Sequence, residues 1–352
     1  MSETPHLVLV GGFLGAGKTT LILAAARELA RQGLRSAVIL NDQGDSLVDT
    51  QLARAQGLEA SEVVGGCFCC RFSDLLESAE RLLEHSPDVI FAEPVGSCTD
   101  LNATTVLPIQ ASYRDRFRLA PLTVLVDPAK ARALAAPGAD PDQVFLFSKQ
   151  VQEADLVCMT KADAHPETPE VGHPNVRHLS ARTGDGVAAW LDEVLSGRLA
   201  ASGRVLDIDY ERYARAEAAL VWLNLEVALD CDPPQTPAMV LGPLFDGIEA
   251  GLTAAAIAIV HLKASVTSDS GWVKAAVCAN GDQPEVEGDL DASPTRRHRI
   301  LVNLRSGGDP ESVRAMVETE VAKLNGQPGG LHLACFRPSA PKPQHRMTSL
   351  ST

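Results

Sequence analysis

Aromatic residues are scarce in this sequence, at 4% of its 352 residues, although 45% of the residues are hydrophobic. A core with so few rings must be built from Ala, Val and Leu, as in many α/β proteins. Basic residues are also fewer than acidic ones: the sequence has 31 Lys and Arg but 45 Asp and Glu, which gives a formal net charge of −14. Nucleic acids and anionic membranes are bound through basic faces, so we expect proteins, nucleotides or cations as partners instead.

Long apolar runs are missing as well. The most apolar late stretch, residues 251–260, is shorter than the roughly 20 residues of a membrane-spanning helix. Residues 1–6 are polar and lead into a short apolar run, without the basic and long apolar regions of a signal peptide. A cytoplasmic location is therefore expected. Eight cysteines in a chain of this length do not suggest a disulfide scaffold, and clustered cysteines in a leaderless protein more often bind metal or react.

The length of the chain favours two domains. Residues 1–203 alternate apolar runs with segments of helical periodicity, which predicts an α/β domain with a mainly parallel sheet covered by helices. The boundary is expected within residues 203–216. Residues 216–337 predict a smaller α+β domain, a ferredoxin-like sandwich with one additional strand. Residues 338–352 are rich in Pro, Ser and Lys and are predicted to be disordered.

Periodicity and turn residues locate the individual elements. In the first domain we expect strands at 6–12, 36–42, 88–93, 122–127, 156–161 and 177–180, and helices at 18–31, 73–84 and 187–195. In the second we expect strands at 219–229, 261–266, 272–279, 298–305 and 331–336, and helices at 237–257 and 310–324, with an acidic loop at 281–291.

A motif near the N-terminus predicts a phosphate site. Residues 12–19 match G-x-x-x-x-G-K-[ST], follow an apolar run and open a helical segment, a context that a glycine-rich turn with a chance lysine would not supply. Glycines let backbone N–H groups face the phosphates, while Lys18 would reach the β- and γ-phosphates in catalysis and Thr19 would bind Mg²⁺. The expected nucleotide-binding residues here are Gly12, Gly15, Ala16, Gly17, Lys18, Thr19 and Thr20.

Two later segments select the base. Residues 160–163, Thr-Lys-Ala-Asp, resemble the [NT]-K-x-D element of GTPases, in which Asp163 would accept from guanine donors that adenine lacks. Alone, this segment could also be a strand end with a capping Asp. Residues 180–182, Ser-Ala-Arg, resemble the element whose backbone N–H meets guanine O6. Together they predict GTP and GDP as ligands, with Thr160, Lys161, Asp163, Ser180, Ala181 and Arg182 at the base.

Three cysteines, Cys67, Cys69 and Cys70, flank Phe68 within four residues. Their thiols can converge on a soft or borderline cation, with a fourth ligand from elsewhere or an open position. Zn²⁺ is the default for thiolates, and Co²⁺ and Ni²⁺ fit the same ligands. Buried packing or a redox-active set are alternatives. Cys98, near the expected γ-phosphate, is predicted to be incidental.

The phosphate motif at 12–20, together with Gly-Cys-Phe-Cys-Cys at 66–70, resembles the CobW-like GTPases, relatives of the nickel-insertion GTPases that mature urease and hydrogenase. The resemblance covers about residues 6–200. It implies a metallochaperone, a GTPase that binds a transition metal at the Cys-x-Cys-Cys motif and delivers it to a client protein. The family often carries a His-rich stretch, whereas the nine histidines here are scattered, so metal storage is not expected.

The resemblance also implies roles for three carboxylates. The family's N-E-x-G-[ED] segment is Asn-Asp-Gln-Gly-Asp here, which puts Asp42 in the catalytic switch region and Asp45 near the metal thiolates; an acidic turn that caps a helix at Asp45 is the alternative. The family's E-x-[ST]-G is Glu-Pro-Val-Gly here. The resemblance implies that Glu93 lies near Mg²⁺ and takes part in catalysis, and that the backbone N–H of Gly96 lies near the γ-phosphate. Asp127 is a rival Mg²⁺ carboxylate, but we expect it to cap the helix after Pro128.

Three functions fit these motifs. The chain is a GTP-hydrolysing metallochaperone with slow turnover in the absence of its client, a conformational GTPase that gates assembly or cofactor loading of a corrinoid or metal enzyme, or a nucleotide-dependent binding module. In the first, loss of the γ-phosphate would release the region around Asp42 and change the metal affinity. The metal, the client and the oligomeric state, with a homodimer as one option, are not specified by the sequence.

Overall fold

A computed structural model describes residues 4–43 and 48–350, which divide into two compact units. Of the described residues, 4–43, 49–216 and 340–350 belong to the first unit, and residue 48 and 217–339 to the second. The first unit therefore ends at the C-terminal limit of the expected boundary region 203–216. Residues 340–350, here called the C-terminal segment, differ from the expected disordered tail because they are hydrogen-bonded to the first unit.

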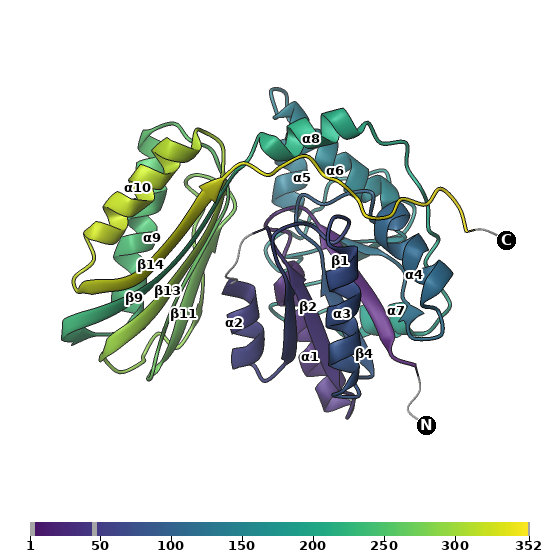
Figure 1. The fold of residues 1–352 in the computed structure, drawn as a ribbon, viewed down its shortest axis with the longest axis horizontal. Coiled ribbons are helices and arrows are strands. Elements are labelled where there is room, and N and C mark those ends of the chain that lie inside the picture. The colour runs from purple at the N-terminus through teal and green to yellow at the C-terminus, as the bar shows by residue number, and fades with distance from the viewer. Residues whose placement is uncertain (1–3, 44–47, 351–352) are drawn as a thin grey trace. The chain divides into compact units, whose positions relative to one another are not determined.

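The first unit is built on a parallel sheet with the strand order β3-β2-β4-β1-β6-β7-β8, and β5 also pairs with β1 (Figure 1). This confirms the predicted mainly parallel sheet. Its strands are β1 (His6–Gly12), β2 (Ser36–Asn41), β3 (Glu59–Val63), β4 (Val89–Glu93), β5 (Arg118–Leu119), β6 (Thr123–Val126), β7 (Leu156–Met159) and β8 (Val176–His178). The helical elements are α1 (Lys18–Arg31), α2 (Val48–Ala55), α3 (Phe72–Leu83), the π-helix η1 (Asn102–Val106), α4 (Leu107–Ser112), α5 (Pro128–Ala135), α6 (Pro141–Glu153), α7 (Val187–Leu195) and α8 (Tyr210–Ala218).

Strand β1 lies in the middle of this sheet, between β4 and β6. Its residues Leu7, Val8, Leu9 and Val10 are at most 1% exposed, as expected for a parallel strand covered on both faces. All the motifs predicted to bind nucleotide follow the carboxyl ends of parallel strands. Since these ends share one edge of the sheet, the fold brings the motifs together where α/β proteins bind ligands.

The second unit is an antiparallel sheet with the order β12-β11-β10-β13-β9-β14, against which α9 and α10 pack on one face (Figure 1). The order β14-β9-β13-β10 with its two helices is the predicted ferredoxin-like arrangement. Strands β11 and β12 extend its edge, because part of the expected acidic loop forms β12. The elements are β9 (Val221–Gln235), α9 (Pro237–Ala254), β10 (Ile259–Ser268), β11 (Gly271–Val277), β12 (Glu285–Gly288), β13 (Thr295–Ser306), α10 (Pro310–Ala322) and β14 (Gln327–Phe336).

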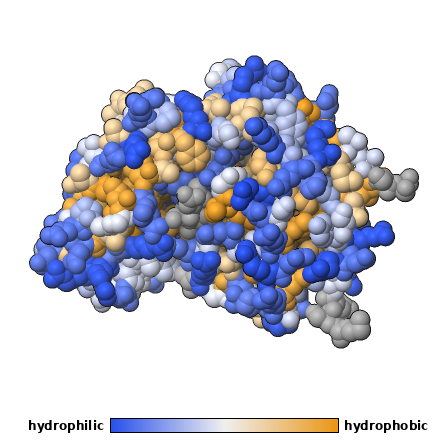
Figure 2. Space-filling model, viewed as in Figure 1, coloured by the Kyte–Doolittle hydropathy of each residue, from blue (hydrophilic) through white to orange (hydrophobic). Residues whose placement is uncertain are grey.

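Hydrophilic residues predominate on the face of the molecule shown in Figure 2, and the apolar residues on it form interrupted patches. Of the helices in the part of the chain that the structure describes, none has both the length and the apolar character to span a bilayer.

A buried carboxyl lies at the end of α6. Glu153 is fully buried and accepts hydrogen bonds from Thr99 Oγ1 and Asn102 N, both at 3.3 Å. Burial, with a smaller contribution from the charge of Asp100, raises the pKa of Glu153 from 4.5 to about 8. The folded protein therefore keeps Glu153 protonated over a pH range in which the unfolded chain has lost that proton.

We expect Glu153→Gln to remove a pH-dependent loss of stability. Because unfolding releases the Glu153 proton between pH 4.5 and about 8, the free energy of unfolding of the wild type falls as pH rises through that window. Glutamine has no such proton, so its free energy of unfolding should not fall in this way. Between pH 5 and pH 8, the difference in free energy of unfolding between variant and wild type should therefore shift by on the order of 3 kcal/mol in favour of the variant. Urea unfolding at pH 5, 6.5 and 8 measures this, with exposed Glu77→Gln as the control. Parallel pH curves for the wild type and Glu153→Gln would contradict it.

Candidate functional site

The loop between β1 and α1 has the backbone conformation of a phosphate-binding loop. Gly15 and Gly17 have φ values of 79° and 86°, which favour glycine. A Cβ at Gly12 would lie 2.6 Å from Leu125 O, so this position also accepts only glycine without a shift of β6. Lys18 Nζ donates to Gly12 O at 2.9 Å and folds back over the loop. Among the described residues no side chain caps the start of α1, whose N–H groups and dipole suit an anion.

Thr19 and Glu93 meet beside this loop. Thr19 Oγ1 donates to Glu93 Oε2 at 2.9 Å, and Lys18 Nζ lies 4.0 Å from Glu93 Oε1. All three side chains are buried. A hydroxyl and a carboxylate next to a phosphate site are the hard oxygen donors that Mg²⁺ prefers, so this pair can hold a phosphate-bound Mg²⁺. Three residues predicted to act together are thus brought together.

The loop that follows β4, residues 93–98, closes on the phosphate loop. A Cβ at Gly96 would lie 2.7 Å from Leu14 Cδ2 and 3.1 Å from Leu14 N, so a side chain here would collide with the phosphate loop. Gln150 Nε2, from α6, donates to both Gly96 O and Cys98 O at 2.9 Å and fixes the course of loop 93–98. The predicted position of Gly96 next to the phosphates is consistent with this packing.

The two base-selecting elements are joined to each other and to the phosphate loop. Thr160 Oγ1 donates to Ala16 O at 3.0 Å. Asp163 Oδ1 accepts from Ser180 Oγ at 2.6 Å, and Arg182 Nη2 lies 2.5 Å from Asp163 Oδ2. The hydrogen bond from Ser180 lowers the pKa of Asp163, and the charge of Arg182 adds to this effect. The two base-selecting elements are therefore joined by an ionised carboxylate.

The remaining residues predicted to bind the nucleotide lie in or next to the same loops and helix starts. Lys161 Nζ lies 3.1 Å from Asp127 Oδ2, and Asp127 also accepts from Ala129 N at 2.8 Å, so it caps α5 as predicted. Thr20 lies in the first turn of α1, and Ala181 lies in the turn after β8.

The thiols of Cys67, Cys69 and Cys70, here called the cysteine cluster, converge. Their Sγ atoms are 2.7 Å apart for Cys67 and Cys69, 3.4 Å for Cys67 and Cys70, and 3.7 Å for Cys69 and Cys70. Tetrahedral coordination at a Zn–S distance of about 2.3 Å places ligand sulfurs about 3.8 Å apart. The sulfurs of Cys67 and Cys69 would have to separate by about 1 Å and those of Cys67 and Cys70 by about 0.4 Å. Within the described residues, these three thiols lie within 4.8 Å of one another and could together hold a metal ion.

Asn41, at the end of β2, holds the cysteine cluster in place. Its Nδ2 donates to Gly66 O at 2.7 Å and to Val63 O at 2.9 Å, and its Oδ1 accepts from Phe68 N at 2.9 Å. The neighbouring Asp42 donates its N–H to Val63 O at 3.2 Å, and its side chain is partly exposed at the same edge of the sheet. Asp45, the predicted additional metal ligand, lies outside the described residues.

Burial also affects the acidity of the cluster. Cys67 and Cys69 are at most 2% exposed. Hydrogen bonds with Cys67 and Cys70, together with burial, raise the pKa of the Cys69 thiol. The packed thiols thus favour their protonated forms, and a bound cation would displace protons.

The C-terminal segment lies against the cysteine cluster from another side. Lys342 N donates to Cys70 Sγ at 3.1 Å, and Gln344 N donates to Cys69 O at 2.8 Å. Ser73 N donates to Gln344 Oε1 at 2.9 Å. Further along, Arg346 Nε lies 2.8 Å from the buried Asp100 Oδ2. Polar contacts thus hold this Pro- and Ser-rich stretch against the rest of the first unit.

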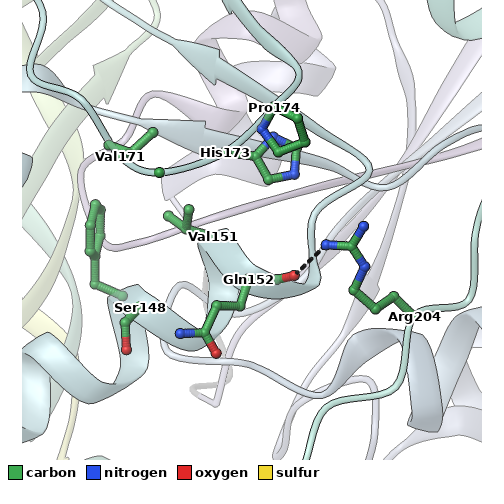
Figure 3. A pocket seen from close by; sticks show the side chains of 9 residues that line it. Ser148, Val151, Gln152, Val171, His173, Pro174 and Arg204 are labelled. Atoms are coloured by element: carbon green, nitrogen blue, oxygen red, sulfur yellow. Dashed lines mark hydrogen bonds between the residues drawn. The ribbon is translucent and has the colours of Figure 1, made fainter.

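A pocket of about 300 Å³ in the first unit is separate from these groups (Figure 3). It lies beside α6, and Arg204 Nη1 donates to Gln152 O at 3.4 Å across its rim. The ring nitrogens of His173 are bonded to Asn175 O and Ala154 O, each at 3.0 Å, which indicates a structural histidine. No residue of the phosphate loop or of the cysteine cluster is among those that line it.

The sequence pattern alone did not indicate two residues of this site, Asn41 and Gln150. Asn41 and Gln150 orient the cluster and loop 93–98 through backbone oxygens. Asn41 has a local signal, since it opens the Asn-Asp-Gln-Gly-Asp segment, whereas Gln150 lies mid-helix and has none.

Comparison with known proteins agrees with this arrangement. Two curated relatives are the zinc chaperone YjiA of Escherichia coli (strain K12), 30% identical over 183 residues, and the zinc chaperone CobW of a Sinorhizobium species, 29% identical over 181 residues. The first alignment covers 50% of this chain and 55% of the relative, and the second covers 44% and 50%. The chain thus spans about half the length of these relatives.

A crystal structure of HypB from Helicobacter pylori in complex with nickel is 16% identical, with a TM-score of 0.41, over 57% of this chain and 91% of that one. Residues 6–183, about half of the chain, match the family described as CobW/HypB/UreG, nucleotide-binding domain. That match contains the phosphate loop, the cysteine cluster, loop 93–98 and both base-selecting elements. The chain belongs to the CobW/HypB/UreG family.

Proposed function

We propose that this protein is a GTP-hydrolysing metallochaperone, which binds a transition metal at the cysteine cluster and delivers it to a client protein. The observation that carries the proposal is the convergence of three thiols within 4.8 Å in the same unit as the phosphate loop and Asp163, the carboxylate predicted to select guanine. The two relatives described above are named zinc chaperones, which supports zinc as the cargo. Co²⁺ and Ni²⁺ fit the same thiolates.

The residues of the nucleotide site have separate tasks in this proposal. Lys18 neutralises charge on the β- and γ-phosphates, and Asp163 pairs with the guanine N1–H and amine. Thr19 and Glu93 are the candidates to hold Mg²⁺, which when bound supplies charge neutralisation at the phosphates. Asp42 follows β2 next to Asn41, so a nucleotide-dependent shift there would be felt by the cysteine cluster through the contacts of Asn41.

Metal and nucleotide affinities are coupled if the geometry of the thiols in the cysteine cluster differs between the GTP-bound and GDP-bound states. A change in metal affinity caused by GTP must then equal the change in GTP affinity caused by metal. Hydrolysis would thereby convert a tightly binding state into a releasing one. Without such coupling, the chain would remain a GTPase that gates a client by its conformation alone.

We expect Zn²⁺ and Co²⁺ affinities to differ at least tenfold between the Mg²⁺-GDP and Mg²⁺-GTP-analogue states, which is a coupling free energy of about 1.4 kcal/mol. Titration of purified protein with Co²⁺ shows thiolate coordination directly by charge-transfer absorption, and chelator competition gives the Zn²⁺ affinity. Cys69→Ser should abolish the absorption, because it removes the central thiol of the cluster.

Cys335→Ser is the matched control, since this partly buried thiol lies in β14 of the second unit and contacts Pro310 O. It should leave both affinities unchanged. Equal metal affinity in the two nucleotide states would favour the gating function, and a Cys69→Ser variant that binds metal like the wild type would overturn the metal assignment.

A further inference from the structure

The C-terminal segment contacts the cysteine cluster at its most accessible thiol. Within the cluster, Cys67 and Cys69 are at most 2% exposed, whereas Cys70 is partly exposed. Lys342 N donates to Cys70 Sγ at 3.1 Å, and Gln344 N donates to Cys69 O at 2.8 Å. A nitrogen and a sulfur at 3.1 Å are in contact, so no further ligand atom fits between them. The backbone of the C-terminal segment therefore occupies a position from which a metal or an incoming ligand would approach Cys70.

Gln344 also binds the first turn of α3, the helix that begins two residues after the cluster. The N-cap position of α3 holds Arg71, whose guanidinium has donors only and cannot accept from the N–H groups of the helix. Gln344 Oε1 instead accepts from Ser73 N at 2.9 Å and from Ser73 Oγ at 3.2 Å. The ring of His345 packs edge-on against Phe72, with centroids 5.1 Å apart. The C-terminal segment thus supplies the helix cap that Arg71 cannot.

Arg346 anchors the segment at a second position. Its Nε lies 2.8 Å from Oδ2 of Asp100, and its Nη2 donates to Leu206 O at 3.1 Å. The side chain of Asp100 is 1% exposed, whereas that of Arg346 is 33% exposed. Because a buried carboxylate loses its counter-charge when such a pair breaks, the pair favours the attached segment. Arg346 itself can leave toward solvent without opening the core.

We propose that the C-terminal segment is an autoinhibitory lid, which closes the cysteine cluster at Cys70 and is held in place by the ion pair of Arg346 and Asp100. Polar contacts attach it, and Lys342, Gln344 and Arg346 are themselves exposed, so it can detach as a unit. A metal ion, or a thiol or imidazole of a client, then reaches Cys70. This consequence rests on the proposed function, whereas the closure of Cys70 does not.

Alkylation of Cys70 by iodoacetamide in the full-length, metal-free protein with GDP tests the closure directly. Mass spectrometry of the tryptic peptide that ends at Arg71 localises and quantifies the product. Arg346→Ala should raise the rate at Cys70 by on the order of tenfold, because loss of the ion pair lets the segment detach. Gln344→Ala removes the side-chain contact with Ser73 and leaves the ion pair, so it should raise the rate by a smaller factor, about threefold.

Arg337→Ala is the matched control. It makes the same change of charge shortly before the C-terminal segment, but Arg337 donates to Ala218 O and Gly308 O, which belong to the second unit. Cys70 in this variant should react at the wild-type rate. Unchanged GDP binding shows that each variant is folded.

Metal exchange gives a second measurement, because a lid slows entry and exit alike. Arg346→Ala should raise the rates of Co²⁺ uptake and of Co²⁺ release to a chelator by similar factors, on the order of tenfold. Its dissociation constant should stay within about threefold of the wild type. A wild-type alkylation rate at Cys70 in both folded variants would overturn the lid and leave the proposed function intact. Absence of Co²⁺ and Zn²⁺ binding in the wild type would overturn the proposed function, and faster alkylation in the variants would then still support the lid.

Discussion

Replacing Lys18 with alanine is expected to slow GTP hydrolysis by on the order of a thousandfold. Lys18 is 7% exposed, and its ammonium lies over the phosphate loop, bonded to Gly12 O at 2.9 Å. Removing a buried, preorganised charge from the position where negative charge develops costs about 10²–10³ in rate in comparable sites. The loss here should reach the upper end, because the carboxylate of Glu93, 4.0 Å from Lys18 Nζ, would then face the phosphates without its counter-charge.

Single-turnover hydrolysis with protein in excess over labelled GTP measures the effect even when the wild-type rate is slow. Lys149→Ala is the control, since this lysine on α6 donates to Asp207 O instead. It should stay within about twofold of the wild type, as expected for a surface change away from the site. A loss of less than tenfold in a folded Lys18→Ala variant would mean that Lys18 does not contact the phosphates.

Features with a local chemical signature were predictable from the sequence. Helix α1 begins and ends where the pattern placed it, because Gly17 and Lys18 define its start and the apolar period ends at Arg31. The two base-selecting motifs were recognisable in the sequence, and the structure brings Asp163 and Ser180 into contact because they follow neighbouring parallel strands, β7 and β8. In each case a few consecutive residues determine the local backbone conformation, and the order of the strands in the sheet brings these segments together at one edge.

Features that depend on long-range packing were not predictable. The course of loop 93–98 is fixed by the side chain of Gln150, which lies more than fifty residues later. Strand β12 is charged and mostly exposed, so its composition indicates a loop, and only pairing with β11 makes it a strand. The C-terminal segment has few apolar residues, and its order comes from partners such as Asp100 that lie far away in the sequence.

Replacing Asp163 with asparagine is expected to exchange the base preference from guanine to xanthine. The two oxygens of the Asp163 carboxylate can accept hydrogen bonds from the N1–H and the exocyclic amine of guanine. In asparagine one of these oxygens is replaced by an NH₂ group, which donates, and the remaining oxygen carries no charge. Charge-assisted hydrogen bonds contribute about 1.5–3 kcal/mol each, so the affinity for GTP should fall by roughly 10²–10³. Xanthine carries a carbonyl in place of the amine, to which the new N–H donates.

The structure makes this exchange a specific test. Asparagine keeps an Oδ1 that can accept the 2.6 Å hydrogen bond from Ser180 Oγ, so the base-selecting elements should stay joined. Arg182, which contacts the other oxygen of Asp163, has a side chain 79% exposed and can turn away for the base. Competition of GTP and xanthosine triphosphate against a fluorescent GDP analogue measures both affinities. Asp185→Asn, which changes a nearby carboxylate bonded to Thr183 Oγ1, should leave the preference for GTP unchanged. If Asp163→Asn keeps its GTP affinity within threefold and gains none for xanthosine triphosphate, Asp163 does not contact the base.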